Sequence, residues 1–130
     1  MRILQQCFRV YAEEIEAAVA FYEGLQGVAC ERRVKIPETS VEAAKVGGFL
    51  ILAGDKAHLD PIRHVDAIFY VDSLDEFADW LSSHGASIVD GPRSVTAGTN
   101  LTARHADGLV VEYFEAGARP ASPDLRSSPL

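Results

Sequence analysis

The sequence has little cysteine and no long hydrophobic run. Its 130 residues include only two cysteines, Cys7 and Cys30, and two thiols fit a reducing cytoplasm better than a disulfide scaffold. No segment approaches the roughly 18 uncharged apolar residues of a membrane span. The apolar run at the N-terminus is too short for a signal peptide. The sequence therefore predicts a soluble, cytoplasmic protein.

Positive charge is also scarce. The chain has 12 Lys and Arg residues against 19 Asp and Glu residues, and its formal net charge is -7. Nucleic-acid backbones and anionic membranes bind proteins that present a concentrated positive field, and the basic residues here form no run. The charge therefore argues against nucleic acid or a membrane surface as the main partner.

Common catalytic and cofactor-binding patterns are missing as well. The chain has no glycine-rich phosphate loop after a strand, no CxxC pair and no HExxH sequence. Gly47-Gly48 is typical of a hairpin turn. Cys7 has no His/Asn pair placed to activate it, so the role of a small hydrophobe fits it better than that of a nucleophile. Functional residues are therefore to be sought on the faces of the predicted strands.

Hydrophobic residues make up 48% of the chain, which is enough for the core of one domain. Hydrophobic periodicity and turn residues predict four elements in the first half and a connecting loop after them. These are a strand over 2–11, a helix that ends near Gly27, a strand over 29–36, a hairpin over 41–53 and a loop over 54–63.

The same order of elements returns in the second half. It predicts a strand over 65–71, a helix with Ser73 and Asp75 as cap candidates, a short strand over 86–89, and a hairpin that pairs 95–105 with 109–115. Phe8-Arg9-Val10 aligns with Phe69-Tyr70-Val71 at an offset of 61 residues, and the segment 48–52 aligns with 108–112 at an offset of 60.

This repeat predicts an α+β fold made of two βαβββ modules, over about 1–54 and 64–116, within a single domain of residues 1–116. Residues 117–130 are rich in Ala, Arg, Pro and Ser and are predicted to be a flexible C-terminal tail.

Alternate residues of a strand point to opposite faces, so a strand that packs a helix on one face presents a second row on the other. In the last strand, Glu112 lies in that second row, and a turn at 106–108 places Thr102 opposite Glu112. These rows predict a concave sheet with polar groups among apolar ones, the composition of a small-molecule pocket. The residues predicted to line it, beside Gln5, Asp66 and Glu112, are Arg9, Cys7, His64, Tyr70, Thr102, Arg104 and Phe114.

Among the residues of the predicted pocket, Glu112 most strongly indicates a functional site. Burying a carboxylate within the apolar segment Val110–Phe114 costs free energy unless the group forms an ion pair, binds a metal or stays hydrated. It fits a structural ion pair with Arg9 or Arg104, a functional role as metal ligand or general base, or a solvent-facing edge position. Asp66 can equally be a solvated residue at the start of a strand or a residue of the functional site.

Three segments together resemble the vicinal oxygen chelate superfamily. They are residues 3–10, the Phe21-Tyr22 pair and residues 107–113, and the resemblance covers residues 2–116. The group includes glyoxalase I, extradiol dioxygenases, epimerases and the bleomycin- and fosfomycin-resistance proteins. The resemblance implies two βαβββ modules that form a cup-shaped mixed sheet with the helices on its outer face, and it implies a homodimer.

The resemblance also implies four places for metal ligands, which fall on Gln5, Leu52, Asp66 and Glu112. Leu52 cannot ligate a metal. The three oxygen ligands that remain suit a hard divalent ion such as Mg²⁺ or Mn²⁺, with Ni²⁺ and Zn²⁺ as further candidates, and the metal can also be absent. Extradiol dioxygenases use two His ligands at these places, so their chemistry is not expected here.

Two main functions follow from these residues. The first is a binding protein of the resistance type, without a metal, that holds an aromatic or cationic small molecule in the cup. The alternative is a divalent-metal-dependent lyase or isomerase of glyoxalase type that acts on a small vicinal-oxygen carbonyl compound. Glu112 or a metal-bound water would then act as the base. A degenerate module that serves only as an interaction domain is a third interpretation.

Overall fold

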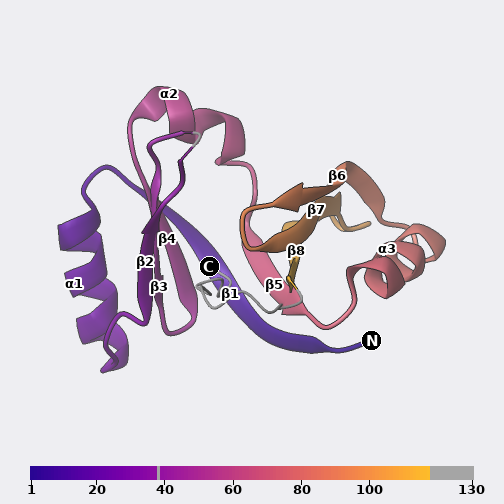
Figure 1. The fold of residues 1–130 in the computed structure, drawn as a ribbon, viewed down its shortest axis with the longest axis horizontal. Helices are drawn as coiled ribbons and strands as arrows, with labels where there is room; N and C mark the ends of the chain where they lie inside the picture. Colours follow the sequence, from indigo (N-terminus) through magenta and orange to yellow (C-terminus); the bar gives the residue numbers. More distant parts are fainter. Residues whose placement is uncertain (38, 118–130) are drawn as a thin grey trace. The chain divides into compact units, whose positions relative to one another are not determined.

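The computed structural model describes residues 1–37 and 39–117 (Figure 1). The predicted tail, apart from Gly117, lies outside these residues. The chain divides into two compact units. The α1 unit contains Cys7–Asp66, and the α3 unit contains Met1–Gln6 together with residues 67–117. Strand β1 (Ile3–Ala12) contributes its first residues to the α3 unit and its remaining residues to the α1 unit.

The α1 unit contains the first strand–helix–three-strand series. After β1 come α1 (Ile15–Gln26), β2 (Arg32–Lys35), β3 (Glu42–Val46) and β4 (Phe49–Ala53). Strand β1 pairs in parallel with β4, and β3 pairs antiparallel with both β2 and β4. Buried residues of α1, β3 and β4 form one core cluster, with Ile15 and Val19 from the helix and Ile51 from the sheet. The predicted first module is thus present.

Gln26 joins the end of α1 to the β3–β4 hairpin. Its Nε2 donates to the carbonyls of Tyr22 at 3.0 Å and Val46 at 2.9 Å, and its Oε1 accepts from the backbone N–H of Gly48 at 2.9 Å. Gly47 has a φ of 58°, and a Cβ added there would lie 2.3 Å from Gln26 Oε1. The hairpin turn predicted at Gly47-Gly48 is confirmed, and this contact gives a physical reason for glycine at position 47.

The α3 unit contains the second series. After the start of β1 come β5 (Ala67–Val71), α3 (Leu74–Ser83), β6 (Ser87–Val95), β7 (Gly98–Arg104) and β8 (Val110–Ala116). Strand β5 pairs in parallel with β8, and β7 pairs antiparallel with both β6 and β8. The predicted hairpin register is confirmed, because Thr102 lies opposite Glu112 and Arg104 opposite Val110.

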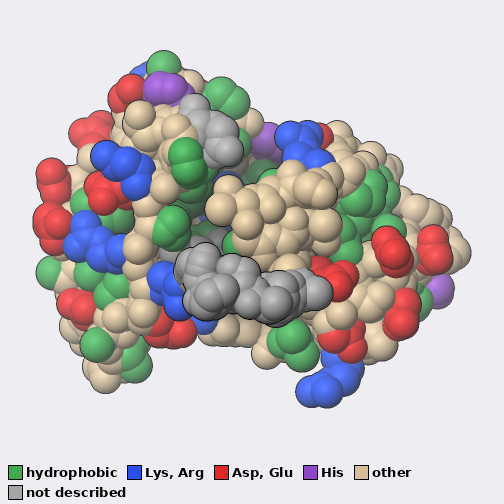
Figure 2. Space-filling view, viewed as in Figure 1, with side chains coloured by type: hydrophobic (Ala, Val, Ile, Leu, Met, Phe, Trp, Pro, Cys, Tyr) green, Lys and Arg blue, Asp and Glu red, His purple; other side chains and the backbone are tan. Residues whose placement is uncertain are grey.

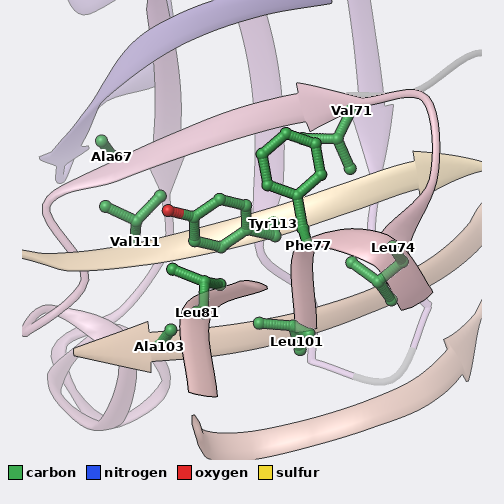
Figure 3. Packing of buried hydrophobic residues seen from close by; sticks show 9 residues of the cluster. All are labelled: Ala67, Val71, Leu74, Phe77, Leu81, Leu101, Ala103, Val111 and Tyr113. Atoms are coloured by element: carbon green, nitrogen blue, oxygen red, sulfur yellow. The ribbon is translucent and has the colours of Figure 1, made fainter. Parts of the chain in front are cut away.

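Helix α3 packs its apolar face on β5, β7 and β8 (Figure 3). Phe77 lies against Tyr113 of β8, with ring centroids 5.7 Å apart. The helix begins at a double cap. Ser73 Oγ accepts from the backbone N–H of Glu76 at 3.3 Å, and Glu115 Oε1 accepts from that of Leu74 at 2.7 Å. Strand β8 therefore satisfies one of the N–H groups that a helix leaves unpaired at its start.

The α+β class with two βαβββ modules is confirmed. The strands follow the order β2-β3-β4-β1-β5-β8-β7-β6 in one mixed, eight-stranded sheet. None of the helices within 1–37 and 39–117 reaches the length and apolarity that crossing a bilayer requires.

Two elements differ from the prediction. The segment 54–63 is not a plain loop, because it contains α2 (Lys56–Leu59) and the short 3-10 helix η1 (Asp60–Ile62). Asp55 starts α2, since its Oδ1 accepts from the backbone N–H of His58 at 2.9 Å. The strand predicted over 86–89 continues to Val95, past Gly91-Pro92. Strand β6 is the last strand in the sheet order, and an edge strand tolerates proline because one of its sides needs no ladder hydrogen bonds.

Candidate functional site

The α3 unit has a sheet face that its helix does not cover. Val111 and Tyr113 of β8 belong to the core cluster beneath α3, so Val110, Glu112 and Phe114 point to the opposite side. We call this side the inner face. The neighbouring strands add four residues to it, which are Ile68, Tyr70, Asn100 and Thr102.

Glu112 is the charged group at the middle of the inner face. Its side chain is half-buried, and its Oε2 accepts a hydrogen bond from Asn100 Nδ2 at 2.9 Å. Thr102 lies directly opposite Glu112 on β7, and Ile68 lies opposite it on β5. The sheet pairing and the Asn100 amide together fix where this carboxylate stands.

Tyr70 and Phe114 are two buried aromatic residues on the inner-face side of their strands. Their ring centroids are 6.0 Å apart and the ring planes meet at 76°, an edge-to-face contact. Their exposed fractions are 5% and 4%. Their strands are hydrogen-bonded neighbours, and the two residues are register partners. Two rigid rings therefore lie beside the strand pair that carries Glu112.

The other predicted residues of the α3 unit lie nearer its margins. Gln5, on the part of β1 that belongs to this unit, is half-buried. Arg104 is exposed at the end of β7, opposite Val110. The structure therefore brings Thr102, Tyr70 and Phe114 to the inner face with Glu112, and places Arg104 at the end of the same strand pair.

The remaining predicted residues belong to the α1 unit. His64 and Asp66 are exposed, and the Asp66 carbonyl accepts from the backbone N–H of Arg9 at 3.0 Å. Arg9 lies over the ring of Tyr11, with its Cζ 5.5 Å from the ring centroid. Cys7 is buried, and burial raises the pKa of its thiol above the ordinary value. A raised pKa keeps the thiol protonated at neutral pH, in line with the expected role as a small hydrophobe.

Lys45 is a buried cation that was not predicted. Its exposed fraction is 7%, and its Nζ lies 3.2 Å from both carboxylate oxygens of Glu31. Lysine is rarely buried unless it is paired, and here the pairing carboxylate comes from the segment before β2. Its neighbours Ala44 and Val46 are buried as well, and nothing in the local sequence indicated that Lys45 is buried with them.

Asn100 is the inner-face residue that sequence reasoning missed. It lies two residues before Thr102 on the same strand, so strand alternation places both on one face. That spacing was a usable signal. The bond to Glu112 was not, because it depends on side-chain conformation.

His105 directly precedes the turn at 106–108. It is half-buried, and its Nε2 lies 2.7 Å from the hydroxyl of Tyr113, on the helix side of the sheet. Burial raises the pKa of Tyr113 to about 12. The pair therefore belongs to the core beneath α3 and adds nothing to the inner face.

The side chains around Glu112 offer few ligands for a metal. Within 1–37 and 39–117, no group of three or more His, Cys, Asp or Glu side chains could hold a metal ion. The inner face supplies Glu112 as its one carboxylate, beside an amide that donates to it, a hydroxyl and apolar groups. That donor set alone does not fit a divalent ion. The predicted ligand set of Gln5, Asp66 and Glu112 draws on both units and stays a prediction.

Comparison with solved structures shows what the chain resembles. An uncharacterised protein from Methanosarcina mazei is 41% identical, over 93% of this chain and 98% of that one, with a TM-score of 0.83. Methylmalonyl-CoA epimerase from Mycobacterium tuberculosis is 18% identical, over 89% and 90% of the two chains, with a TM-score of 0.66. The chain therefore has the fold of methylmalonyl-CoA epimerase, as the resemblance to the vicinal oxygen chelate superfamily led us to expect.

A second methylmalonyl-CoA epimerase was solved in complex with methylmalonyl-CoA and NH4+. It is 18% identical, over 90% of this chain and 97% of that one, with a TM-score of 0.65. At this identity the similarity to the epimerases is one of fold. No protein-family model and no curated protein matches the sequence. The shared fold therefore leaves the activity to be argued from the residues themselves.

Proposed function

We propose that the protein binds a small aromatic or cationic molecule on the inner face of the α3 unit, with Glu112 as the group that recognises it. The observation that carries this proposal is the half-buried Glu112 carboxylate, which Asn100 Nδ2 holds at 2.9 Å. An ionised carboxylate only accepts hydrogen bonds, so it selects a ligand that presents N–H or O–H donors or a positive charge. Tyr70 and Phe114 are buried beside the carboxylate, and their edge-to-face contact stiffens the strand pair that carries Glu112.

A carboxylate at this position carries a cost in desolvation. Residues 110 and 114, which flank Glu112 on the inner face, are Val and Phe and are buried. An apolar residue at 112 would avoid the cost of removing a charge from water. The pairing with Asn100 lowers that cost and sets the orientation of the carboxylate, which is the arrangement expected of a binding group.

The replacement Glu112→Gln tests the proposal. It keeps the size of the side chain and removes its charge. We expect wild-type protein to bind members of a panel of small aromatic amines and amidines, and Glu112→Gln to bind them about ten to a hundred times more weakly, because a hydrogen bond to a charged group is lost. Calorimetric titration measures both affinities.

Two controls accompany this titration. Glu13→Gln removes an exposed carboxylate of the α1 unit and should leave the affinities unchanged. Matched aromatic carboxylates should not bind better than the amines. If no amine or amidine binds, or if Glu112→Gln binds them as well as wild type does, the proposal fails.

A second candidate function is a lyase or isomerase of glyoxalase type that acts on a small carbonyl compound. The fold shared with methylmalonyl-CoA epimerases, one of them solved with methylmalonyl-CoA, favours it. Glu112 would be the base that takes a proton next to the carbonyl, and the Asn100 amide would fix its orientation. No step is assigned to a metal, because the donors around Glu112 do not by themselves fit one.

Metal titration separates the two candidates. We expect calorimetry of wild-type protein with Mg²⁺, Mn²⁺, Ni²⁺ and Zn²⁺ to show no stoichiometric binding, since a single carboxylate binds a divalent ion weakly. Tight binding of one ion per chain that disappears in Glu112→Ala would reverse this preference. It would place a metal at Glu112 and favour the metal-dependent lyase or isomerase.

We further propose that two copies associate in solution. The superfamily resemblance is one reason, and apolar surface on the α1 unit is the other.

A further inference from the structure

Strand β6 brings two further charged side chains to the inner face. The register places Asp90 opposite Thr102 of β7. It places Arg93 opposite Asn100, the residue that donates to Glu112. Residues that lie opposite each other in an antiparallel pair point to the same side of the sheet. Arg93 Nη2 also donates to Asp90 Oδ1, so the inner face extends across β7 to a charged pair on β6.

An irregularity in β6 places both residues on one face. In a regular strand, residues three positions apart point to opposite sides. The register of β6 shifts between Ile88 and Asp90 and again between Asp90 and Arg93, as it does at a β-bulge. Gly91 lies at the second shift with a φ of 84°, and a Cβ added there would lie 2.8 Å from the carbonyl oxygen of Asn100. The sequence therefore supports the irregularity, because this close contact requires glycine.

The pair on β6 is accessible, in contrast to the buried rings of Tyr70 and Phe114. The side chains of Asp90 and Arg93 are each 55% exposed. Glu112 and the β7 residues opposite the pair are half-buried. Strand β6 lies two strands from β8, which is a distance of roughly 10 Å. A small molecule that spans this distance can bind Glu112 and the pair together.

Arg93 has the chemistry to bind a carboxylate. Its guanidinium carries five N–H donors in a planar fork that matches two carboxylate oxygens, and the bond to Asp90 is made by Nη2. An ion pair this exposed contributes little to stability, so a carboxylate from solution can share Arg93 with Asp90 or displace it. The chain as a whole is acidic, and Figure 2 shows acidic side chains over both α1 and α3. A basic group on the inner face therefore adds a preference for an anion that the net charge of -7 does not.

We propose that the ligand of the inner face is a zwitterion, whose ammonium group binds Glu112 and whose carboxylate binds Arg93. The inference rests on the function proposed above, because it takes Glu112 as the group that binds the cation. Asn100 of the intervening strand orients Glu112. Since one strand separates the two charged residues, the charges of the ligand stand several bonds apart, as in an aminomethyl-substituted aromatic acid. An α-amino acid fits less well, because its two charged groups are bonded to one carbon.

Two compounds that differ by one carboxylate, para-aminomethylbenzoate and benzylamine, test the proposal. Calorimetric titration of wild-type protein should show that para-aminomethylbenzoate binds about five to ten times more tightly, because it gains a charge-assisted hydrogen bond at an exposed arginine. Arg93→Gln should erase this difference, and Arg93→Lys should retain part of it, since lysine keeps the charge but not the fork. Both variants change an exposed side chain, so circular dichroism should show folded protein.

Asp90→Asn separates ligand binding from a purely structural role of the pair. It removes the carboxylate that competes for Arg93, so it should tighten the binding of para-aminomethylbenzoate about threefold. If the pair only stabilised β6, Asp90→Asn and Arg93→Gln would have the same effect on both compounds. Arg33→Gln is the matched control, because Arg33 is an exposed arginine that pairs with Glu16 in the α1 unit. It should leave the difference between the compounds unchanged.

The outcomes distinguish this inference from the function proposed above. If benzylamine binds wild type but not Glu112→Gln, and the added carboxylate gives no further affinity, the zwitterion is wrong and the proposed function stands. If Arg104→Gln removes the added affinity and Arg93→Gln does not, the assignment to Arg93 is wrong. If neither compound binds wild-type protein, both proposals fail.

Discussion

Replacing Phe77 by alanine is expected to lower the free energy of unfolding by about 3 to 5 kcal/mol. Phe77 is 6% exposed and lies at the centre of the core cluster of the α3 unit, against the ring of Tyr113. Its removal would leave a cavity between α3 and β8 that the sheet cannot close, because β8 is fixed by β5 on one side and β7 on the other.

Trp80→Ala is the comparison for this variant. Trp80 lies on the same helix, but it is 46% exposed and stacks on His84 at 3.9 Å between centroids. Its loss should cost less than about 1 kcal/mol. Urea denaturation followed by circular dichroism measures both. Equal losses for the two variants would mean that α3 does not pack through the face described here.

Gly98→Ala is expected to destabilise the protein by about 3 kcal/mol or more, a large effect for one methyl group. Gly98 begins β7, between Val95 of β6 and Ala116 of β8. A Cβ added there would lie 2.1 Å from the carbonyl oxygen of Glu115 and 2.8 Å from the backbone N of Gly117. Both are backbone atoms, so the end of the β7–β8 pair must separate to admit the methyl group.

Gly24→Ala provides the opposite case. Gly24 lies inside α1, and no atom would lie within 4 Å of a Cβ added there. Alanine should therefore stabilise the helix by roughly 0.5 to 1 kcal/mol, because it restricts the unfolded chain and adds no clash. Thermal unfolding of the two glycine variants should give shifts of opposite sign. A neutral Gly98→Ala would contradict the described packing of β7 against β8.

The order of elements and the β7–β8 register could be predicted because local signals determine them. Gly47-Gly48 and Asp107-Gly108 mark turns, and a turn of known length sets which residues of a hairpin face each other. Thr102 and Glu112 were therefore placed opposite each other from the sequence. Alternation along β8 likewise placed Glu112 and Phe114 on one face.

Side-chain burial could not be predicted in the same way. Phe77 and Trp80 are both large apolar residues of α3 at helical spacing, yet only Phe77 meets the sheet, because the apolar stripe of a helix is wider than the surface it covers. Lys45 looks like a surface residue until Glu31, from a different segment, is seen to pair with it. Such contacts join residues that no local pattern connects.

The candidate site contains one residue that the local sequence indicated and one that it did not. Glu112 stood out because a charge interrupts an apolar strand, which is a local signal. Its partner Asn100 did not stand out, because an amide within a half-polar strand is ordinary and the bond between them forms across two strands. The charged group of a site was thus predictable, and the group that orients it was not.

Ligand titration of isotopically labelled protein, followed by nuclear magnetic resonance, tests the proposed inner-face site most directly. When a small aromatic amine is added, the side-chain amide signal of Asn100 and the backbone signals of Thr102 and Glu112 should move together, and Glu112→Gln should abolish these movements at the same amine concentration. If the signals that move belong instead to residues away from β5, β7 and β8, or if they move equally in Glu112→Gln, the inner face is not the binding site.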